Sequence, residues 1–250
     1  WQDHIGDFSY GVRGNISTIK NKVTYIHETL DAIDGQTFHT YGAITRFEVG
    51  KPAWYFYGYE FNGIDKETGF PTFRDLNEDG AITDADKTMI GKGIADLTYG
   101  ITLTAAWKGF DLIVFGTGAA GGDIYSCLNR SDYTLNKLTY FTEDRWNKTT
   151  NPNGSKPRAG ATEMDKYYLS SASIFNGNYF KIKQIQLGYT FPQKWMKTIK
   201  VQNLRVYASL DDFITFSDYP GFDPEVTNMG VDKGNFPTSK KVVAGVSITF

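Results

Sequence analysis

Apolar and polar residues alternate along much of this chain, and this period of two is the feature that most limits how it can fold. The alternating runs are residues 8–17, 101–108, 184–191, 204–211 and 244–250. Successive side chains of a β-strand point to opposite faces of a sheet, so each run predicts a strand with one apolar face and one polar or small face. We therefore expect an all-β chain of antiparallel strands.

Each strand is expected to reach about 9–11 residues, the length that a tilted strand needs to cross a bilayer. In a soluble sandwich the apolar face would cover a second sheet, whereas in a membrane barrel it would contact lipid. The connections favour the barrel. Residues 107–110 predict a tight turn, and long loops are expected at about 62–96, 122–172 and 213–238. Short turns on one side and long loops on the other are typical of outer-membrane barrels.

The composition excludes several classes of protein. The net charge of −2 argues against nucleic acid as a partner, and the single cysteine, Cys127, excludes an internal disulfide and a zinc site built from cysteines. No run of about 18 apolar residues occurs, so no transmembrane helix is predicted. Aromatic residues make up 16% of the chain, an excess that indicates a sugar-binding surface or a belt at a membrane interface.

The sequence lacks motifs for catalysis, and we expect that the chain is not an enzyme. His4, His27 and His39 are far apart and lack ligand spacing, and neither a nucleophile elbow nor a His-Glu-x-x-His motif occurs. Residues 116–121 match a dinucleotide-binding fingerprint, but no helix is predicted after them, so we interpret them as a glycine-rich strand end. The aromatic run 54–61 is interpreted as core packing or an interface belt.

Residues 75–86 (DLNEDGAITDAD) fit the twelve-residue loop that binds calcium. Oxygen-bearing side chains recur at alternate positions, and Gly80 allows the sharp turn that the loop needs. The candidate ligands are the side chains of Asp75, Asn77, Asp79, Thr83 (directly or through water) and Asp86 and the backbone carbonyl of Ala81. Asp86 stands where a glutamate is usual, so the expected affinity is modest. The alternative interpretation is an acidic turn that holds no metal.

The last residues alternate between apolar and small or polar side chains and end on an aromatic ring. Residues 245–250 (GVSITF) resemble the C-terminal signal of bacterial outer-membrane barrels, which the barrel-assembly machinery reads. The resemblance implies that Phe250 contacts this machinery.

Further segments, in order along the chain, are similar to motifs of one family, the SusC/RagA TonB-linked (TonB-dependent) outer-membrane receptors. These segments are residues 50–52 (GKP), 57–64 (YGYEFNGI), 75–86 (DLNEDGAITDAD), 121–125 (GGDIY), 178–183 (NYFKIK), 187–192 (LGYTFP), 204–213 (LRVYASLDDF) and 221–225 (GFDPE). The resemblance runs over nearly the whole chain and corresponds to the C-terminal part of such a receptor.

The resemblance implies an antiparallel transmembrane β-barrel of about 22 strands with an N-terminal plug. Residues 1–250 would supply roughly the last eight strands, next to the plug and the N-terminal strands of the same receptor. It also implies multiple passes through the outer membrane of a Gram-negative bacterium, contact with outer-membrane lipid, and active import of a nutrient such as a glycan or a peptide. A SusD-like surface lipoprotein would cap the barrel, and TonB would act through the plug, outside this chain.

Two other interpretations remain open at this point. One is a calcium-containing β-domain that binds carbohydrate at the cell surface with exposed aromatic rings. The other is a complete small barrel of about eight strands, whose lumen side chains would fill.

Overall fold

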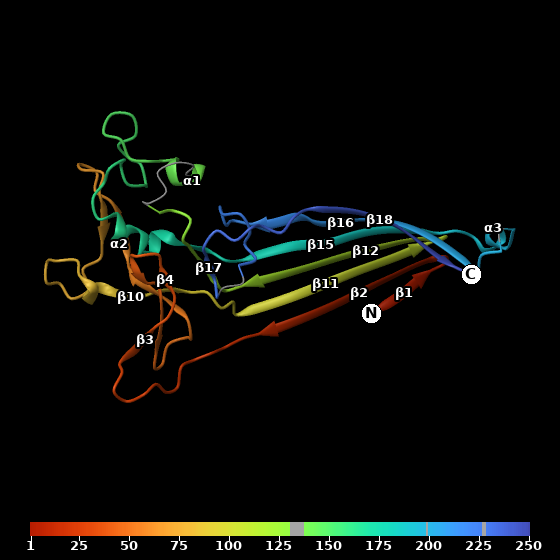
Figure 1. Ribbon diagram of the computed structural model, residues 1–250, viewed down its shortest axis with the longest axis horizontal. Helices are drawn as coiled ribbons and strands as arrows, with labels where there is room; N and C mark the ends of the chain where they lie inside the picture. The colour runs from red at the N-terminus through yellow and green to blue at the C-terminus, as the bar shows by residue number, and fades with distance from the viewer. Residues whose placement is uncertain (131–137, 199, 227–228) are drawn as a thin grey trace.

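The computed structural model describes residues 1–130, 138–198, 200–226 and 229–250. One long twisted sheet extends across the molecule, and a compact region built from the long connections lies at one end of it (Figure 1). No helix in the described part of the chain is long and apolar enough to cross a membrane.

The long sheet has seven antiparallel strands, so the predicted all-β antiparallel class is confirmed. In spatial order they are β1 (Gln2–Ile5), β2 (Phe8–Thr18), β11 (Leu97–Trp107), β12 (Phe110–Ala120), β15 (Tyr179–Thr190), β16 (Asn203–Ser217) and β18 (Lys241–Thr249). Among the described residues β1 and β18 are the two edges and do not pair with each other, as a complete small barrel would require.

Short connections gather at one end of this sheet and long ones at the other. Residues 6–7 join β1 to β2, Lys108 and Gly109 join β11 to β12, and residues 191–202 with the helix α3 (Gln193–Thr198) join β15 to β16. Lys108 and Gly109 have φ of 47° and 91°, the left-handed pair that suits the twist of a two-residue hairpin. The opposite end sends out residues 19–96, 121–178 and 218–240.

The long connections fold into small elements of their own. Residues 19–96 hold β3 (Ala32–Asp34), β4 (Thr37–Phe38), β5 (Gly42–Ala43), β6 (Thr45–Glu48), β7 (Tyr55–Tyr59), β8 (Phe61–Ile64), β9 (Pro71–Phe73), a 3₁₀ turn at Asp84–Asp86 and β10 (Lys87–Lys92). The others hold β13 (Asp123–Ser126), α1 (Thr139–Thr142), α2 (Met164–Tyr168), a 3₁₀ turn at Ser171–Ser173, β14 (Ile174–Asn176) and β17 (Val231–Asp232). Parts of the expected loops 122–172 and 213–238, namely 131–137 and 227–228, lie outside the described residues.

The structure differs from the expected strand count because the aromatic run 54–61 does not join the long sheet. It forms β7 and the start of β8, and β7 pairs with β10 and β6 in a separate sheet. Four of the five residues of β7 are buried, so this strand has no face available for solvent or lipid. The long connection therefore starts at residue 19 and not near 62.

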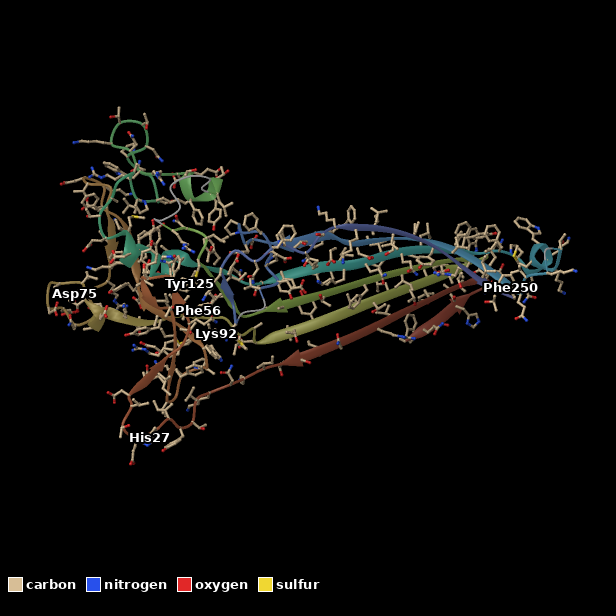
Figure 2. All side chains as sticks on the ribbon, viewed as in Figure 1. His27, Phe56, Asp75, Lys92, Tyr125 and Phe250 are labelled. Atoms are coloured by element: carbon tan, nitrogen blue, oxygen red, sulfur yellow. The ribbon has the colours of Figure 1, made fainter. Side chains whose placement is uncertain are left out.

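The hydrophobic core lies in this region of long connections (residues 19–96, 121–178 and 218–240), hereafter the loop region. It is built from Phe38, Ile44, Phe56, Tyr59, Phe73, Tyr125, Cys127, Tyr167, Tyr168, Leu169 and Val231. The rings of Phe56 and Tyr125 pack edge to face at 5.5 Å, and the Tyr125 hydroxyl donates to the Tyr168 carbonyl at 2.6 Å (Figure 2). Burial raises the pKa of Cys127 to about 12, so this thiol is an ordinary core side chain.

We predict that Phe56→Ala destabilises the loop region by about 3–5 kcal/mol, because the lost ring leaves a cavity in a fully buried site. Hydrogen exchange should accelerate in β7, β10 and β13 and stay unchanged in the long sheet. Phe236→Ala is the control, since that ring is 90% exposed. Equal effects of the two substitutions would contradict the placement of the core.

Candidate functional site

The register of the long sheet aligns apolar side chains on one face. One line of directly paired residues crosses six strands: Val12, Leu103, Val114, Ile185, Leu210 and Val242. Nothing in the described chain covers this face, since Leu103 is 43% exposed and Val242 is 71% exposed. An apolar band that spans six strands is far larger than the scattered apolar residues of an ordinary protein surface, and it marks a contact with another apolar phase.

Two rows of aromatic rings border this aliphatic band. At the short-turn end the directly paired residues Phe8, Trp107, Phe110 and Tyr189 form a row across four strands. At the other end Tyr99 and Phe180 stack at 5.9 Å, and Phe216 follows at 6.4 Å. Tyr99 and Phe180 meet across Gly118, where a Cβ would lie 2.4 Å from the Tyr99 ring.

The length of the band matches the apolar part of a bilayer. Strand β11 has 11 residues. At about 3.3 Å per residue and a tilt of about 40°, such a strand covers about 28 Å of membrane thickness, close to the 25 Å band of outer-membrane barrels. Aromatic belts at both borders are a further property of those barrels.

The opposite face of the sheet is largely polar, although Ile113, Phe115, Tyr207 and Val243 also lie on it. It carries Arg13, Asn15, Thr102, Thr104, Gln184, Gln186, Arg205 and Ser209. Arg205 forms a two-point ion pair with Asp111, with Nε 2.9 Å from Oδ1. Gly188 lies between them, and a Cβ there would approach both side chains to within 2.5 Å. A polar face of this kind suits a wet or plugged lumen.

A cluster of charges that the sequence analysis missed lies on β15 at the loop end of the polar face. Lys181, only 3% exposed, donates to Asp223 at 2.9 and 3.0 Å and to Glu225 at 3.3 Å. Lys183 pairs with the same Glu225 and with Asp212. The cluster therefore ties residues 221–225 to the sheet. The sequence contained one signal, the two lysines, but did not identify their partners, which lie 29 to 44 residues away.

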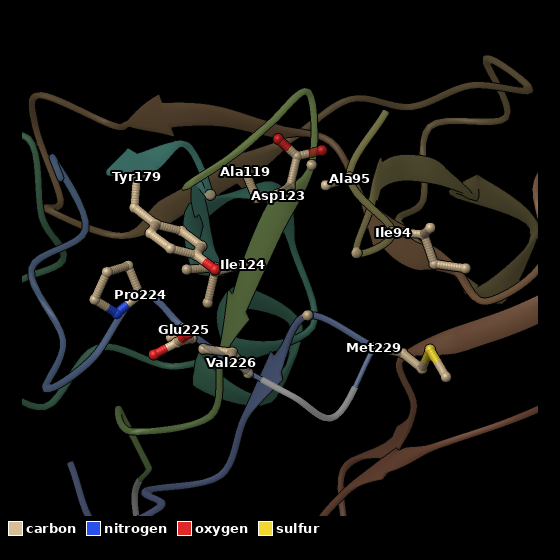
Figure 3. A pocket seen from close by; sticks show the side chains of 14 residues that line it. Ile94, Ala95, Ala119, Asp123, Ile124, Tyr179, Pro224, Glu225, Val226 and Met229 are labelled. Carbon is tan, nitrogen blue, oxygen red and sulfur yellow. The ribbon is translucent and has the colours of Figure 1, made fainter. Parts of the chain in front are cut away.

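A cavity of about 290 Å³ lies next to this cluster, where the sheet meets the loop region. Tyr179, Pro224, Glu225, Asp123 and Ile124 are among the residues that line it (Figure 3). Asp123 is already engaged, since its carboxylate accepts the Lys92 backbone N–H at 3.0 Å. The cavity is small, and part of its lining adjoins residues 227–228, which the structure does not describe.

The candidate metal ligands lie together in one turn between β9 and β10, at the outer edge of the loop region (Figure 2). Asp75 accepts the Gly80 N–H at 2.8 Å, and Asp79 accepts the Ala81 N–H at 2.8 Å. Gly80 has a φ of 84°, and no atom lies near the position of a Cβ, so backbone conformation alone favours glycine there. The loop thus has the predicted sharp turn.

Asp86 and Thr83 have structural roles in this loop. The carboxylate of Asp86 is fully buried and accepts the N–H groups of Leu76 and Thr83, both at 2.8 Å. These two backbone hydrogen bonds, that of Thr83 first, lower the pKa of Asp86 below its usual value. Thr83 in return caps the following 3₁₀ turn, with its hydroxyl accepting the Ala85 N–H at 3.3 Å.

Three observations bear on whether the loop fits a cation. Across the described residues, no three His, Cys, Asp or Glu side chains converge into a metal-holding group, and Asn77 donates to Asp79 at 2.9 Å. In contrast, Oδ1 of Asp75 is buried and has no hydrogen-bond partner. Since a buried carboxylate oxygen without a partner is costly, this atom fits a cation ligand, and calcium binding stays a prediction.

Comparisons with known proteins confirm the expected resemblance. No family model matches the sequence. The chain is 29% identical over 274 residues to TonB-dependent receptor P3 of Formosa agariphila, and 27% identical over 256 residues to TonB-dependent receptor SusC of Bacteroides thetaiotaomicron. Each alignment covers 98% of this chain but only 27% and 25% of those proteins, so the chain spans about a quarter of their length.

Solved structures give the same result for the fold. A structure of the RagAB peptide transporter matches 99% of this chain and 28% of that chain, with a TM-score of 0.80 and 23% identity. The RagAB peptide importer in its open-open state matches with a TM-score of 0.76. The chain is therefore similar, in sequence and in fold, to a segment of a SusC/RagA-like TonB-dependent receptor.

The charge cluster on β15 predicts a loss of order in residues 221–225 at low pH. Burial would raise the pKa of Asp223, but hydrogen bonds from Lys181 and from the N–H groups of Glu225 and Thr238 outweigh it, and the pKa lies below its usual value. A carboxyl whose pKa is lower in the folded state stabilises the folded state at pH values above its unfolded pKa, which is about 3.9 for aspartate. This stabilisation is lost as the pH falls through the folded pKa.

The protection of residues 221–226 against hydrogen exchange, relative to the intrinsic exchange rate at each pH, should thus be high at pH 7 and fall as the pH drops below about 4. Asp223→Asn should give low protection at neutral and at acid pH, whereas Asp218→Asn, at an exposed side chain outside the cluster, should leave the pH dependence intact. Slow exchange of these residues in Asp223→Asn at pH 7 would show that the ion pair does not hold this segment.

Proposed function

We propose that this SusC/RagA-like chain forms part of the wall of an outer-membrane nutrient importer in a Gram-negative bacterium and crosses the membrane several times. The observation that carries the proposal is the aliphatic band between two aromatic rows on one face of the long sheet. The other face of the same sheet is largely polar. In this arrangement the apolar face contacts lipid, and the polar face contacts the lumen, its plug or its cargo.

The relatives support a proposal for the transport cycle of the whole protein. P3 and SusC are TonB-dependent receptors, and the RagAB structures are of a peptide transporter. We infer that energy reaches the importer through TonB acting on a plug, and that a SusD-like surface lipoprotein caps it. A peptide and a glycan are the two expected classes of cargo, and neither requires a catalytic group on this chain. Assembly would use Phe250 as the signal to the barrel-assembly machinery.

Lipid contact can be tested by placing a charge on each face of β11. Leu103 lies in the middle of the aliphatic band, and its neighbour Thr104 lies on the polar face. Leu103→Arg should lower the free energy of unfolding from vesicles by about 2–4 kcal/mol, because the guanidinium enters the bilayer midplane. Thr104→Arg should cost far less, since its side chain faces the lumen.

Val246→Arg gives a depth control for the same measurement. Val246 pairs with Val206, which pairs with Tyr189 of the aromatic row, so the cost there should be only about 0–1 kcal/mol. The measurement is a urea titration of the full receptor folded into phospholipid vesicles. Equal costs at Leu103 and Thr104 would contradict the membrane orientation and favour a soluble β-domain.

We also propose that residues 75–86 bind one calcium ion. Support comes from the partnerless buried Oδ1 of Asp75, from the turn at Gly80, and from the side-chain oxygens of Asn77 and Asp79 next to them. The ligand set would be Asp75, Asn77, Asp79, the Ala81 carbonyl and Asp86, with Thr83 direct or through water. The ion would offset the negative charge of the carboxylates in this turn and would restrict its motion.

Calcium should protect this loop from proteolysis in the full receptor, with half-protection at about 10⁻⁴–10⁻³ M, since Asp86 replaces the usual glutamate. Asp79→Ala should abolish the protection. Asp84→Asn is the matched control, because Asp84 belongs to the same loop but accepts from Tyr59 and pairs with Lys87. Cleavage rates that do not change with calcium would show that the loop is only an acidic turn.

A further inference from the structure

The connection between β15 and β16 is the most elaborate of the connections at the short-turn end. Its helix α3 lies beyond the end of the long sheet, opposite the loop region (Figure 1). Met196 anchors the helix, since it is 5% exposed and its carbonyl accepts the Val201 N–H at 3.1 Å. The Trp195 N–H donates to the Pro192 carbonyl at 2.9 Å. The helix is therefore held in place and is not a loose turn.

Trp195 continues the aromatic row of the sheet into this helix. The ring of Phe110 contacts Tyr189 at 4.6 Å, Tyr189 contacts Phe191 at 5.1 Å, and Phe191 contacts Trp195 at 6.3 Å. The Trp195 ring is 56% exposed although its neighbour in the chain is buried. An exposed tryptophan ring at the end of an aromatic row is typical of the depth at which the lipid headgroups of a membrane lie.

Lysines gather at the same level. Lys194 and Lys197 are three residues apart on α3 and thus share a face, and Lys200 follows three residues later; all three are exposed. Lys108, in the next turn of the sheet, lies over the Trp107 ring at 5.1 Å. The two turns are neighbours, because the Thr190 N–H donates to the Gly109 carbonyl at 2.8 Å.

These four lysines have no acidic partner within the described residues. The lysine and arginine ion pairs in the described part of the chain are formed by other residues. The nearby carboxylate of Asp111 is bound to Arg205. Uncompensated positive charge beside an open aromatic ring is complementary to a surface that carries fixed negative charge over an apolar layer.

We propose that α3 and the turn at Lys108 form a docking site for the phosphate of an anionic phospholipid in the leaflet at the short-turn end of the sheet. The inference rests on the proposed membrane orientation, because the aromatic row sets the level of the headgroups. The three lysines of 194–200 hold the phosphate, and Trp195 packs on the upper part of the acyl chains. The site would fix the depth and rotation of this side of the barrel in the membrane.

The test uses the full receptor in nanodiscs of phosphatidylcholine and phosphatidylglycerol, with the lipids retained by the protein counted by native mass spectrometry. The wild type should retain phosphatidylglycerol above its bulk share. A Lys194→Gln, Lys197→Gln, Lys200→Gln variant should lose at least about fivefold of this preference, and the corresponding arginine variant should keep it. Salt at 0.5 M should also remove the preference of the wild type.

The control replaces three exposed lysines of the loop region, Lys51, Lys148 and Lys233, by glutamine, which gives the same change of net charge. A preference for phosphatidylglycerol that is equal in the wild type and the α3 variant, or that persists unchanged at high salt, would overturn the inference. A receptor that enters nanodiscs without lipid preference fails only this inference, whereas a receptor that does not enter them fails the proposed membrane orientation as well.

Discussion

Every other feature of this structure depends on the long sheet being a single layer. Its strands are in register over about eleven residues, so apolar side chains align from β2 to β18 on one face. In a soluble domain a second layer would cover that face, because burial of apolar surface is the main driving force of folding. No layer of this chain covers it in the described structure, so the surroundings of the sheet must supply the apolar phase.

The single layer explains why the core lies elsewhere. Many of the aromatic side chains outside the two rows lie in the loop region, where Phe56, Tyr125 and their neighbours form a compact core at one end of the sheet. The Lys181 cluster joins the two parts, since it ties residues 221–225 to the polar face of β15. The loop region is thus a folded unit fixed to the end of the sheet and not a set of free loops.

The two ends of the sheet differ in chemistry as well as in length. The loop end carries a folded core, an acidic turn and a network of charges in which Lys181 and Lys183 pair with nearby carboxylates. The short-turn end carries the exposed ring of Trp195 and exposed lysines on and beside α3, next to an aromatic row of the sheet. A sheet with a folded core at one end and exposed aromatic and basic side chains at the other suits a protein that has different neighbours on the two sides of a membrane.

The strands could be predicted from the sequence alone, because a period of two depends only on local backbone geometry. The alternation in residues 204–211 and around Leu103 directly predicts strands with one apolar and one polar face. The acidic loop was equally local, and all its candidate ligands do lie in one turn. Tertiary structure decided the number of strands in the long sheet and the residue at which the first long connection starts. The sequence of residues 54–61 fits a strand of either sheet, and only the folded structure shows that β7 is buried on both faces. Tertiary structure also decided the partners of Lys181, the two aromatic rows and the grouping of lysines around Trp195. Each of these depends on strands far apart in the sequence pairing in register, and no single segment encodes that pairing.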